Sequence, residues 1–298
     1  MLYGAIEAGG TKFVCSVGRG ADDFLSTETF PTTDPAETLG KIVEYFKNFE
    51  QDSGEKLDAI GIACFGPVDL NPDSSHYGYI TSTPKPGWAD TDIVGVFKKA
   101  FEIPVGFDTD VNGAALGEYL WGAGKNHEVV LYLTVGTGIG GGLCINGKPL
   151  HGVMHPEMGH VIMDQDKGKD PFECICPYHQ SCLEGLASGK AVDFRWKVHA
   201  SELADDHPAW DLEADYLAQG IMNYILTVSP QIVIVGGGLM HKELLYPMIR
   251  KKVQQKLNSY IKVPRITEEI ENYIVSPGLK TNSGICGAMG LAMNAEKK

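Results

Sequence analysis

Two stretches of the chain repeat one local pattern, in which an apolar run leads into a glycine-rich turn and a second apolar run follows. The first is MLYGAIEAGGTKFVCSVG at 1–18, and the second is EVVLYLTVGTGIGGGLCING at 128–147. Each stretch predicts two strands joined by a tight turn, and Asn146-Gly147 indicates a further hairpin turn. Because such a pattern occurs twice, far apart in the chain, we expect each stretch to open one of two similarly built halves.

Strands and helices alternate between and after these stretches. Apolar runs predict further strands at 58–67, 104–110 and 231–238. Apolar residues at helical spacing predict a helix whose buried face carries Leu39, Ile42, Val43, Phe46 and Phe49. Further helices are expected at 111–124, at 211–230 with its end at Pro230, at 241–260 and at 283–295. The alternation indicates an α/β fold.

Composition excludes several classes of protein. The formal charge is −13, so a nucleic-acid backbone would be repelled and no nucleic-acid partner is expected. No window of 18 uncharged apolar residues occurs, so no membrane partner is expected either. The N-terminal residues lack a basic stretch followed by an apolar one, and Glu7 comes early. We therefore expect a cytoplasmic protein whose cysteines are reduced.

Three glycine turns suit an anion, because backbone N–H groups can approach it closely where side chains are missing. They are Gly9-Gly10-Thr11, followed by Lys12, then Gly136-Thr137-Gly138 and Gly236-Gly237-Gly238. A tight hairpin also needs glycine, so one turn alone is weak evidence. Two turns in matching strand contexts, with a third after a strand, indicate a nucleotide site. The stretch GLASGKA at 185–191 fails the P-loop pattern, because it is one residue short and lacks the final Ser or Thr.

Asp110 ends the strand PVGFDTD and directly precedes a predicted helix. Ligands of open α/β sheets bind beyond the carboxyl ends of strands. A carboxylate there can accept the proton of a hydroxyl that attacks a γ-phosphate. It can equally cap the helix, because Asp108, Thr109, Asp110 and Asn112 are all capping residue types. Spacing alone leaves both roles open.

A cluster of cysteines and histidines lies at 155–185. The candidate ligands are Cys174, Cys176, His179, Cys182 and His160, with His155 further away. A disulfide knot is disfavoured, because the seven cysteines of the chain are an odd number and no secretion signal is recognised. Mixed thiolate and imidazole ligands are typical of tetrahedral zinc. An ordinary loop with scattered Cys and His is the remaining alternative.

Six motifs occur in one order along the chain and resemble the ROK family of sugar kinases, in particular its bacterial fructokinases. They are GAIEAGGTK (4–12), FDTDVNGAALGE (107–118), LTVGTGIGGG (133–142), HPEMGH (155–160), CPYHQSCLEGLASG (176–189) and IVGGG (234–238). The resemblance covers nearly the whole chain. It implies the two-lobed sugar kinase/actin-like ATPase (ribonuclease H-like) fold, with ATP and Mg²⁺ as cofactors and a hexose bound in a cleft between the lobes.

The resemblance also assigns roles to residues. Asp110 matches the catalytic base, and Glu157, His160 and Glu184 match residues that hold sugar hydroxyls. Asn112 and Gly66 are further candidates for the sugar site, although Gly66-Pro67 suits a simple turn equally well. The first two glycine turns match the phosphate loops. The adenosine loop is matched by Gly236, Gly237, Gly238, Leu239 and Met240.

For the metal, the fructokinase-like sequence CPYHQSC favours His160, Cys176, His179 and Cys182 as ligands of a structural zinc ion. The C-x-C pattern of many relatives would instead recruit Cys174 in place of His179. The implied lobes are 1–117, joined by a C-terminal helix at about 284–298, and 118–283 with the zinc loop at 155–185. Glu7 stands where many relatives carry an aspartate, so its contact with Mg²⁺ stays open.

The expected activity is therefore phosphorylation of the 6-hydroxyl of D-fructose by ATP, in a homodimer. A glucokinase, a mannokinase or an N-acetylmannosamine kinase is the alternative within the family. A non-catalytic sugar-responsive regulator is a further alternative, which we disfavour because the first glycine turn begins at residue 9 and leaves no room before it for a DNA-binding segment.

Overall fold

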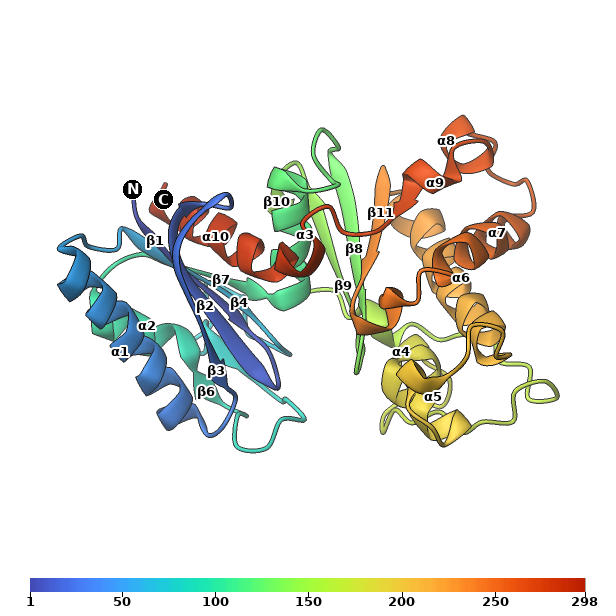
Figure 1. Ribbon diagram of the computed structural model, residues 1–298, viewed down its shortest axis with the longest axis horizontal. Helices are drawn as coiled ribbons and strands as arrows, with labels where there is room; N and C mark the ends of the chain where they lie inside the picture. Colours follow the sequence, from blue (N-terminus) through green and yellow to red (C-terminus); the bar gives the residue numbers. More distant parts are fainter. Residues whose placement is uncertain (298) are drawn as a thin grey trace. The chain divides into compact units, whose positions relative to one another are not determined.

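The computed structural model describes residues 1–297, and the chain packs into two compact units (Figure 1). Unit 1 consists of Met1–Asn126, Gly147–Pro156 and the chain from Gly278 onward, and unit 2 consists of His127–Asn146 and Glu157–Pro277. These units are defined by packing alone. The functional lobes divided at residues 117 and 284 stay a prediction.

Unit 1 is built on a five-stranded mixed sheet with helices on both faces. Its elements are β1 (Tyr3–Ala8), β2 (Lys12–Gly20), β3 (Asp23–Pro31), α1 (Pro35–Ser53), β4 (Ala59–Cys64), β5 (Tyr79–Ile80), β6 (Thr91–Asp92), α2 (Ile93–Phe101), β7 (Val105–Thr109), α3 (Asp110–Trp121), β10 (Lys148–Pro149), η4 (Lys280–Asn282) and α10 (Ser283–Glu296). The sheet order is β3-β2-β1-β4-β7. The hairpin strands β1, β2 and β3 pair antiparallel, whereas β4 and β7 join β1 in parallel.

Successive residues of a strand point to opposite faces of the sheet, and this alternation decides which helix packs on each face. Ile60 and its β1 neighbour Gly4 face α1, where a Cβ on Gly4 would lie 3.2 Å from Phe46. The next residue, Gly61, faces the opposite way and lies against the backbone of α10. A side chain at Gly61 would overlap with the Ala288 carbonyl, so α10 approaches the sheet closely only because this position is glycine.

Helix α1 follows the local rules for a helix. Asp34 caps its N-terminus by accepting a hydrogen bond from the Glu37 N–H, Pro35 occupies the first turn, and Gly54 ends it with a left-handed φ of 73°. The predicted apolar face is confirmed: Leu39, Ile42 and Phe46 are buried, and Val43 and Phe49 pack against the same core.

Unit 2 holds the second mixed sheet. Its elements are β8 (Val129–Val135), β9 (Ile139–Ile145), η1 (Met158–His160), α4 (Leu183–Ala187), α5 (Gly189–Trp196), η2 (Ala200–Glu202), α6 (Ala209–Val228), β11 (Ile232–Gly236), η3 (Gly238–His241), α7 (Leu245–Leu257), α8 (Pro264–Thr267), α9 (Ile270–Tyr273) and β12 (Ile274–Val275). Strands β8 and β9 form an antiparallel hairpin, and β11 and β12 extend the sheet in parallel from β8. Unit 2 therefore repeats the plan of unit 1, in which a hairpin is followed by parallel strands. The predicted duplication of an α/β fold is confirmed.

The predicted elements are present with small shifts at their ends. The helix expected at 211–230 ends at Val228, because Ser229 takes a left-handed conformation before Pro230. The helix expected at 241–260 is shorter, since residues 238–241 form a 3₁₀ turn and Asn258 takes the left-handed conformation. Within residues 1–297, no helix is both long and apolar enough to cross a membrane.

Candidate active site and metal centre

The residues singled out from the sequence lie on both units, and each group is described within its own unit. In unit 1 the first glycine turn joins β1 and β2. Gly9 N–H donates to the Lys12 carbonyl at 3.0 Å, and a Cβ on Gly9 would lie 2.8 Å from that oxygen. The Thr32 hydroxyl donates to the Gly9 carbonyl at 2.7 Å. These hydrogen bonds hold the turn on its buried side, while Gly10, Thr11 and Lys12 are exposed at its tip.

Asp110 is the first residue of α3, and the cap of this helix is its neighbour. The Thr109 hydroxyl accepts the Asn112 N–H at 3.1 Å, so Thr109 and not Asp110 is the N-cap. Asp110 Oδ1 accepts the N–H of Val111 at 2.9 Å. Burial raises the pKa of Asp110 to about 6, although hydrogen bonds from the helix backbone oppose the rise. With such a pKa the carboxyl is mostly ionised near neutral pH.

Glu7, on β1, belongs to the same electrostatic group. Burial, together with the nearby Asp110, raises the pKa of Glu7 to about 7, against the lowering effects of Lys12 and a hydrogen bond from the Ile285 N–H. A carboxyl whose ionisation a neighbouring carboxylate opposes is suited to a cation or to holding a proton. Whether Glu7 contacts Mg²⁺ stays open.

A second carboxylate of the FDTD motif is buried and paired. Asp108 is 2% exposed, and its Oδ2 lies 2.8 Å from His151 Nε2. Its Oδ1 accepts the Thr109 N–H at 2.8 Å and the Asn112 side-chain amide at 2.7 Å. Asn112 is itself fully buried. Its predicted contact with the sugar stays a prediction, and what the structure shows is that its amide orients Asp108.

His155 and Gly66 lie together at the end of β4. His155 Nε2 accepts the Val68 N–H at 3.2 Å, and the Gly66-Pro67 peptide bond is cis. Burial lowers the pKa of His155, with Asp108 acting in the opposite direction. His155 therefore fastens the segment 147–156 to the β4 end of unit 1, and it stands outside the metal group described below.

In unit 2 the other two glycine turns lie next to each other. A Cβ on Gly136, at the β8–β9 turn, would lie 3.8 Å from the Gly238 backbone nitrogen. Gly237 has a φ of 94° and packs against the Val135 backbone, so only glycine fits there. The sheet thus brings the end of β8 and the end of β11 to one edge, as parallel strands require. Leu239 and Met240 are 7% and 4% exposed, so they present mainly backbone at this edge.

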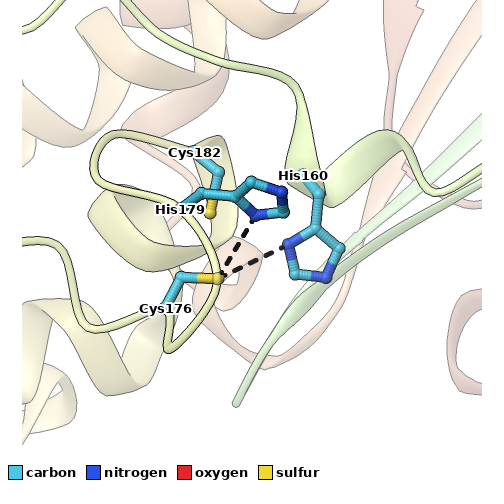
Figure 2. Close-up of side chains that lie close together, drawn as sticks. All are labelled: His160, Cys176, His179 and Cys182. Carbon is cyan, nitrogen blue, oxygen red and sulfur yellow. Dashed lines mark hydrogen bonds between the residues drawn. The ribbon is translucent and has the colours of Figure 1, made fainter. Parts of the chain in front are cut away.

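The predicted metal ligands converge in unit 2. One donor atom from each of His160, Cys176, His179 and Cys182 lies within 4.8 Å of all the others. Figure 2 shows both imidazoles turned toward the Cys176 sulfur, which lies 3.4 Å from His179 Nδ1 and 3.8 Å from His160 Nδ1. Cys182 is fully buried, and the other three are partly exposed. The fold thus brings four ligand candidates from between positions 160 and 182 together in one tetrad.

This tetrad fits zinc by its donors and by its dimensions. Zn–N and Zn–S bonds of about 2.0 and 2.3 Å in a tetrahedron separate neighbouring donors by about 3.3–3.8 Å, and the two contacts of the Cys176 sulfur with the histidines, 3.4 and 3.8 Å, match this range. Burial raises the pKa of Cys182 to about 12, and the sulfurs of Cys176 and Cys174 contribute. A divalent cation would compensate this crowding of sulfurs. Cys174 lies close by but outside the tetrad, against Gly185.

The predicted sugar ligands of unit 2 adjoin the tetrad. Glu157 is exposed and directly precedes η1, which carries His160. With Nδ1 of His160 directed at Cys176, its Nε2 lies 3.9 Å from Glu184 Oε1. One imidazole therefore links the tetrad to a carboxylate predicted to hold a sugar hydroxyl, which is the arrangement expected of a ligand oriented by a metal.

Comparison with known proteins supports the family resemblance that the motifs indicated. The sequence matches the ROK family over residues 3–295. The chain belongs to the ROK family. The fructokinase of Zymomonas mobilis is 45% identical over 100% of this chain and 98% of its own length, and the fructokinase of Pediococcus pentosaceus is 43% identical over 100% and 99%. A ROK family glucokinase from Streptomyces griseus, solved with glucose and AMPPNP, has a TM-score of 0.75 at 26% identity and covers 99% of this chain and 100% of that one.

As a ROK protein with sugar kinase structural neighbours, the chain has the sugar kinase/actin-like ATPase fold, and this prediction is confirmed. Three relationships escaped the sequence reasoning. These are the pairing of His151 with Asp108, the position of Glu184 beneath the second glycine turn, and the electrostatic coupling of Glu7 to Asp110. None has a motif, because each joins residues that are at least 43 positions apart.

Proposed function

We propose that this ROK protein is an ATP-dependent fructokinase that transfers the γ-phosphate to the 6-hydroxyl of D-fructose. The observation that carries the proposal is the identity of 43–45% with named fructokinases over the full chain. The match is not confined to a nucleotide-binding part, so it includes the residues that would select the sugar.

Asp110 is the proposed general base. Thr109 rather than Asp110 is the helix cap, and the Asp110 carboxyl has a pKa raised to about 6, so it is ionised near neutral pH and basic enough to accept a hydroxyl proton. Because Asp110 is in the first turn of α3, its carboxyl accepts the Val111 N–H, and this hydrogen bond holds the side chain in place. In the forward step the hexose hydroxyl loses its proton to Asp110, its oxygen bonds to the γ-phosphorus, and the bond from that phosphorus to the bridging oxygen of ATP breaks.

The glycine turns are the proposed nucleotide ligands. Backbone N–H groups at Gly9–Lys12 and at Gly136–Gly138 suit phosphate oxygens, and the ends of β8 and β11 form the edge where the nucleoside would bind. Mg²⁺ bound with ATP supplies neutralisation of the phosphate charge. Lys12 adds a positive charge at the exposed tip of the first turn.

Glu157, His160 and Glu184 are the proposed sugar ligands of unit 2. A zinc ion bound by four protein donors has no open position for water, so it would act structurally and supply no Lewis acid. We propose that the zinc ion orients the His160 ring so that the nitrogen not bound to the metal points toward the sugar.

A coupled assay of ADP release over fructose, mannose, glucose and N-acetylmannosamine tests the proposal. Fructose should give the highest kcat/KM, and the phosphorus–proton coupling in the NMR spectrum of the product should place the phosphate on carbon 6. A higher kcat/KM for glucose or mannose would favour the corresponding kinase instead. Absence of hexose-dependent ADP release would leave a sugar-responsive regulator as the better explanation.

We further propose that the protein works in the cytoplasm, where ATP is available and thiols stay reduced, as a homodimer. The dimer is an expectation from the family resemblance. Sedimentation velocity at micromolar protein concentration tests it directly, because a mass near 32 kDa rather than near twice that value would contradict it.

A further inference from the structure

The turn Gly136-Thr137-Gly138 is shaped by contacts that come from the metal loop. The turn closes on itself through a hydrogen bond from the Gly136 N–H to the Gly138 carbonyl, 2.9 Å. Thr137 is exposed at the tip, and Ile139, which starts β9, is buried. The orientation of the backbone N–H groups at such a tip depends on what holds its two ends.

Both ends are held by one short segment, Cys182–Gly189. At the far end of the turn, Glu184 Oε2 accepts the Ile139 N–H at 3.0 Å. At the near end, the Gly189 N–H donates to the Gly136 carbonyl at 2.7 Å. A Cβ on Gly138 would lie 2.6 Å from Glu184 Oε2, so the carboxylate lies directly against the turn.

The segment begins at a residue of the metal tetrad. Cys182 is the N-cap of α4, where its sulfur accepts the Gly185 N–H at 3.4 Å, and Glu184 is in the first turn of the same helix. The Glu184 carbonyl in turn accepts the Ser188 N–H at 3.1 Å, one residue before Gly189. The carboxylate that holds β9 is therefore only two positions along the chain from the residue with the buried sulfur.

A second route runs through His160. Gly159, its neighbour in η1, packs against the Ile139 carbonyl so closely that any side chain there would overlap with it. The His160 Nε2 lies 3.9 Å from Glu184 Oε1. The Leu183 N–H donates to the Val161 carbonyl at 2.9 Å, which ties the two routes together. The two segments that carry Cys182 and His160 both touch the glycine turn.

We propose that Glu184 is a positioning residue for the turn 136–138, and that an ion held by His160, Cys176, His179 and Cys182 therefore strengthens nucleotide binding as well as sugar binding. The inference rests on the proposed function, in which this turn binds ATP phosphates. A turn held before the ligand arrives loses less conformational entropy on binding, so its affinity for the ligand is higher.

The experiment measures AMP-PNP·Mg²⁺ binding by calorimetry in the absence of any sugar, which removes the proposed sugar contact of Glu184 from the result. Glu184→Ala should weaken nucleotide binding by about 5- to 20-fold. Glu184→Gln keeps an oxygen that can accept the Ile139 N–H and should stay within about 3-fold of the parent. The matched control is Glu173→Ala, in the same loop, where the side chain is 92% exposed and should change nothing.

Metal removal supplies the second arm. Protein stripped with a chelator should bind AMP-PNP about 5-fold or more weakly, and the amides of Ile139 and Gly189 should exchange hydrogen for deuterium faster than in the zinc-loaded protein. This exchange arm also decides the matter if Glu184→Ala does not fold. Unchanged nucleotide affinity in Glu184→Ala, alongside a raised KM for fructose, would overturn the inference and leave Glu184 as a sugar ligand alone. If the parent binds AMP-PNP but releases no ADP with any hexose, the proposed function fails by itself.

Discussion

His151 Nε2 lies 2.8 Å from Asp108 Oδ2, which joins a histidine of the segment 147–156 to a carboxylate two residues before the proposed base. Asp108 is 2% exposed, whereas the His151 side chain is 39% exposed. A partly exposed imidazole therefore lies within hydrogen-bonding distance of a carboxylate that water does not reach. Burial raises the pKa of Tyr77 and the charge of Asp108 adds to this rise, whereas at His155 the same charge opposes the lowering of the pKa by burial.

His151→Ala should destabilise the fold by about 1–3 kcal/mol, because Asp108 would keep its two amide donors and lose its partner for Oδ2. Urea denaturation followed by circular dichroism measures this loss. Asp108→Asn is the matched variant, and in its background the further change His151→Ala should have little effect. A His151→Ala protein as stable as the parent would contradict the pairing.

Asp110→Asn should lower kcat by at least ~100-fold while sparing AMP-PNP binding, because the change removes the proton acceptor and keeps the shape of the side chain. Thr109→Ala is the control for the neighbouring cap. It should lower the free energy of unfolding by about 1 kcal/mol and affect kcat far less. Near-normal turnover in Asp110→Asn would remove the residue from the base role.

The pH dependence of kcat/KM for the hexose should report the raised pKa of Asp110. The base is active only when ionised, so activity should rise with pH through about 6 and then level off. Glu7, with a pKa of about 7, is mostly protonated where Asp110 ionises, so Glu7→Gln removes no charge there and should leave this rising limb nearly in place. A rate that is flat between pH 5 and 7 would disagree with the assignment.

The zinc content of purified variants should identify the ligands. Metal analysis should find one zinc per chain in the parent, and Cys176→Ser and His179→Ala should lose most of it, because both side chains belong to the tetrad. Cys174→Ser should retain the metal, since Cys174 lies outside that group. The reverse result, retention in His179→Ala and loss in Cys174→Ser, would show that Cys174 is the fourth ligand.

The sequence by itself determined the features that depend on neighbours a few positions away. The apolar face of α1, with its Asp34 cap and its end at Gly54, follows from helical spacing and capping chemistry. The two glycine hairpins and the parallel strands after them follow from apolar runs broken by glycine. The metal tetrad could also be predicted from the sequence, because three of its four members lie within a stretch of seven residues.

Only the tertiary structure decided which distant side chains meet. Sequence spacing left Asp110 as either base or cap, and the folded helix has Thr109 as its cap. The partnership of His151 with Asp108 spans 43 positions, and that of Glu184 with Ile139 spans 45. No local signal marks such pairs, because a buried carboxylate takes whichever donor the folded chain brings within reach.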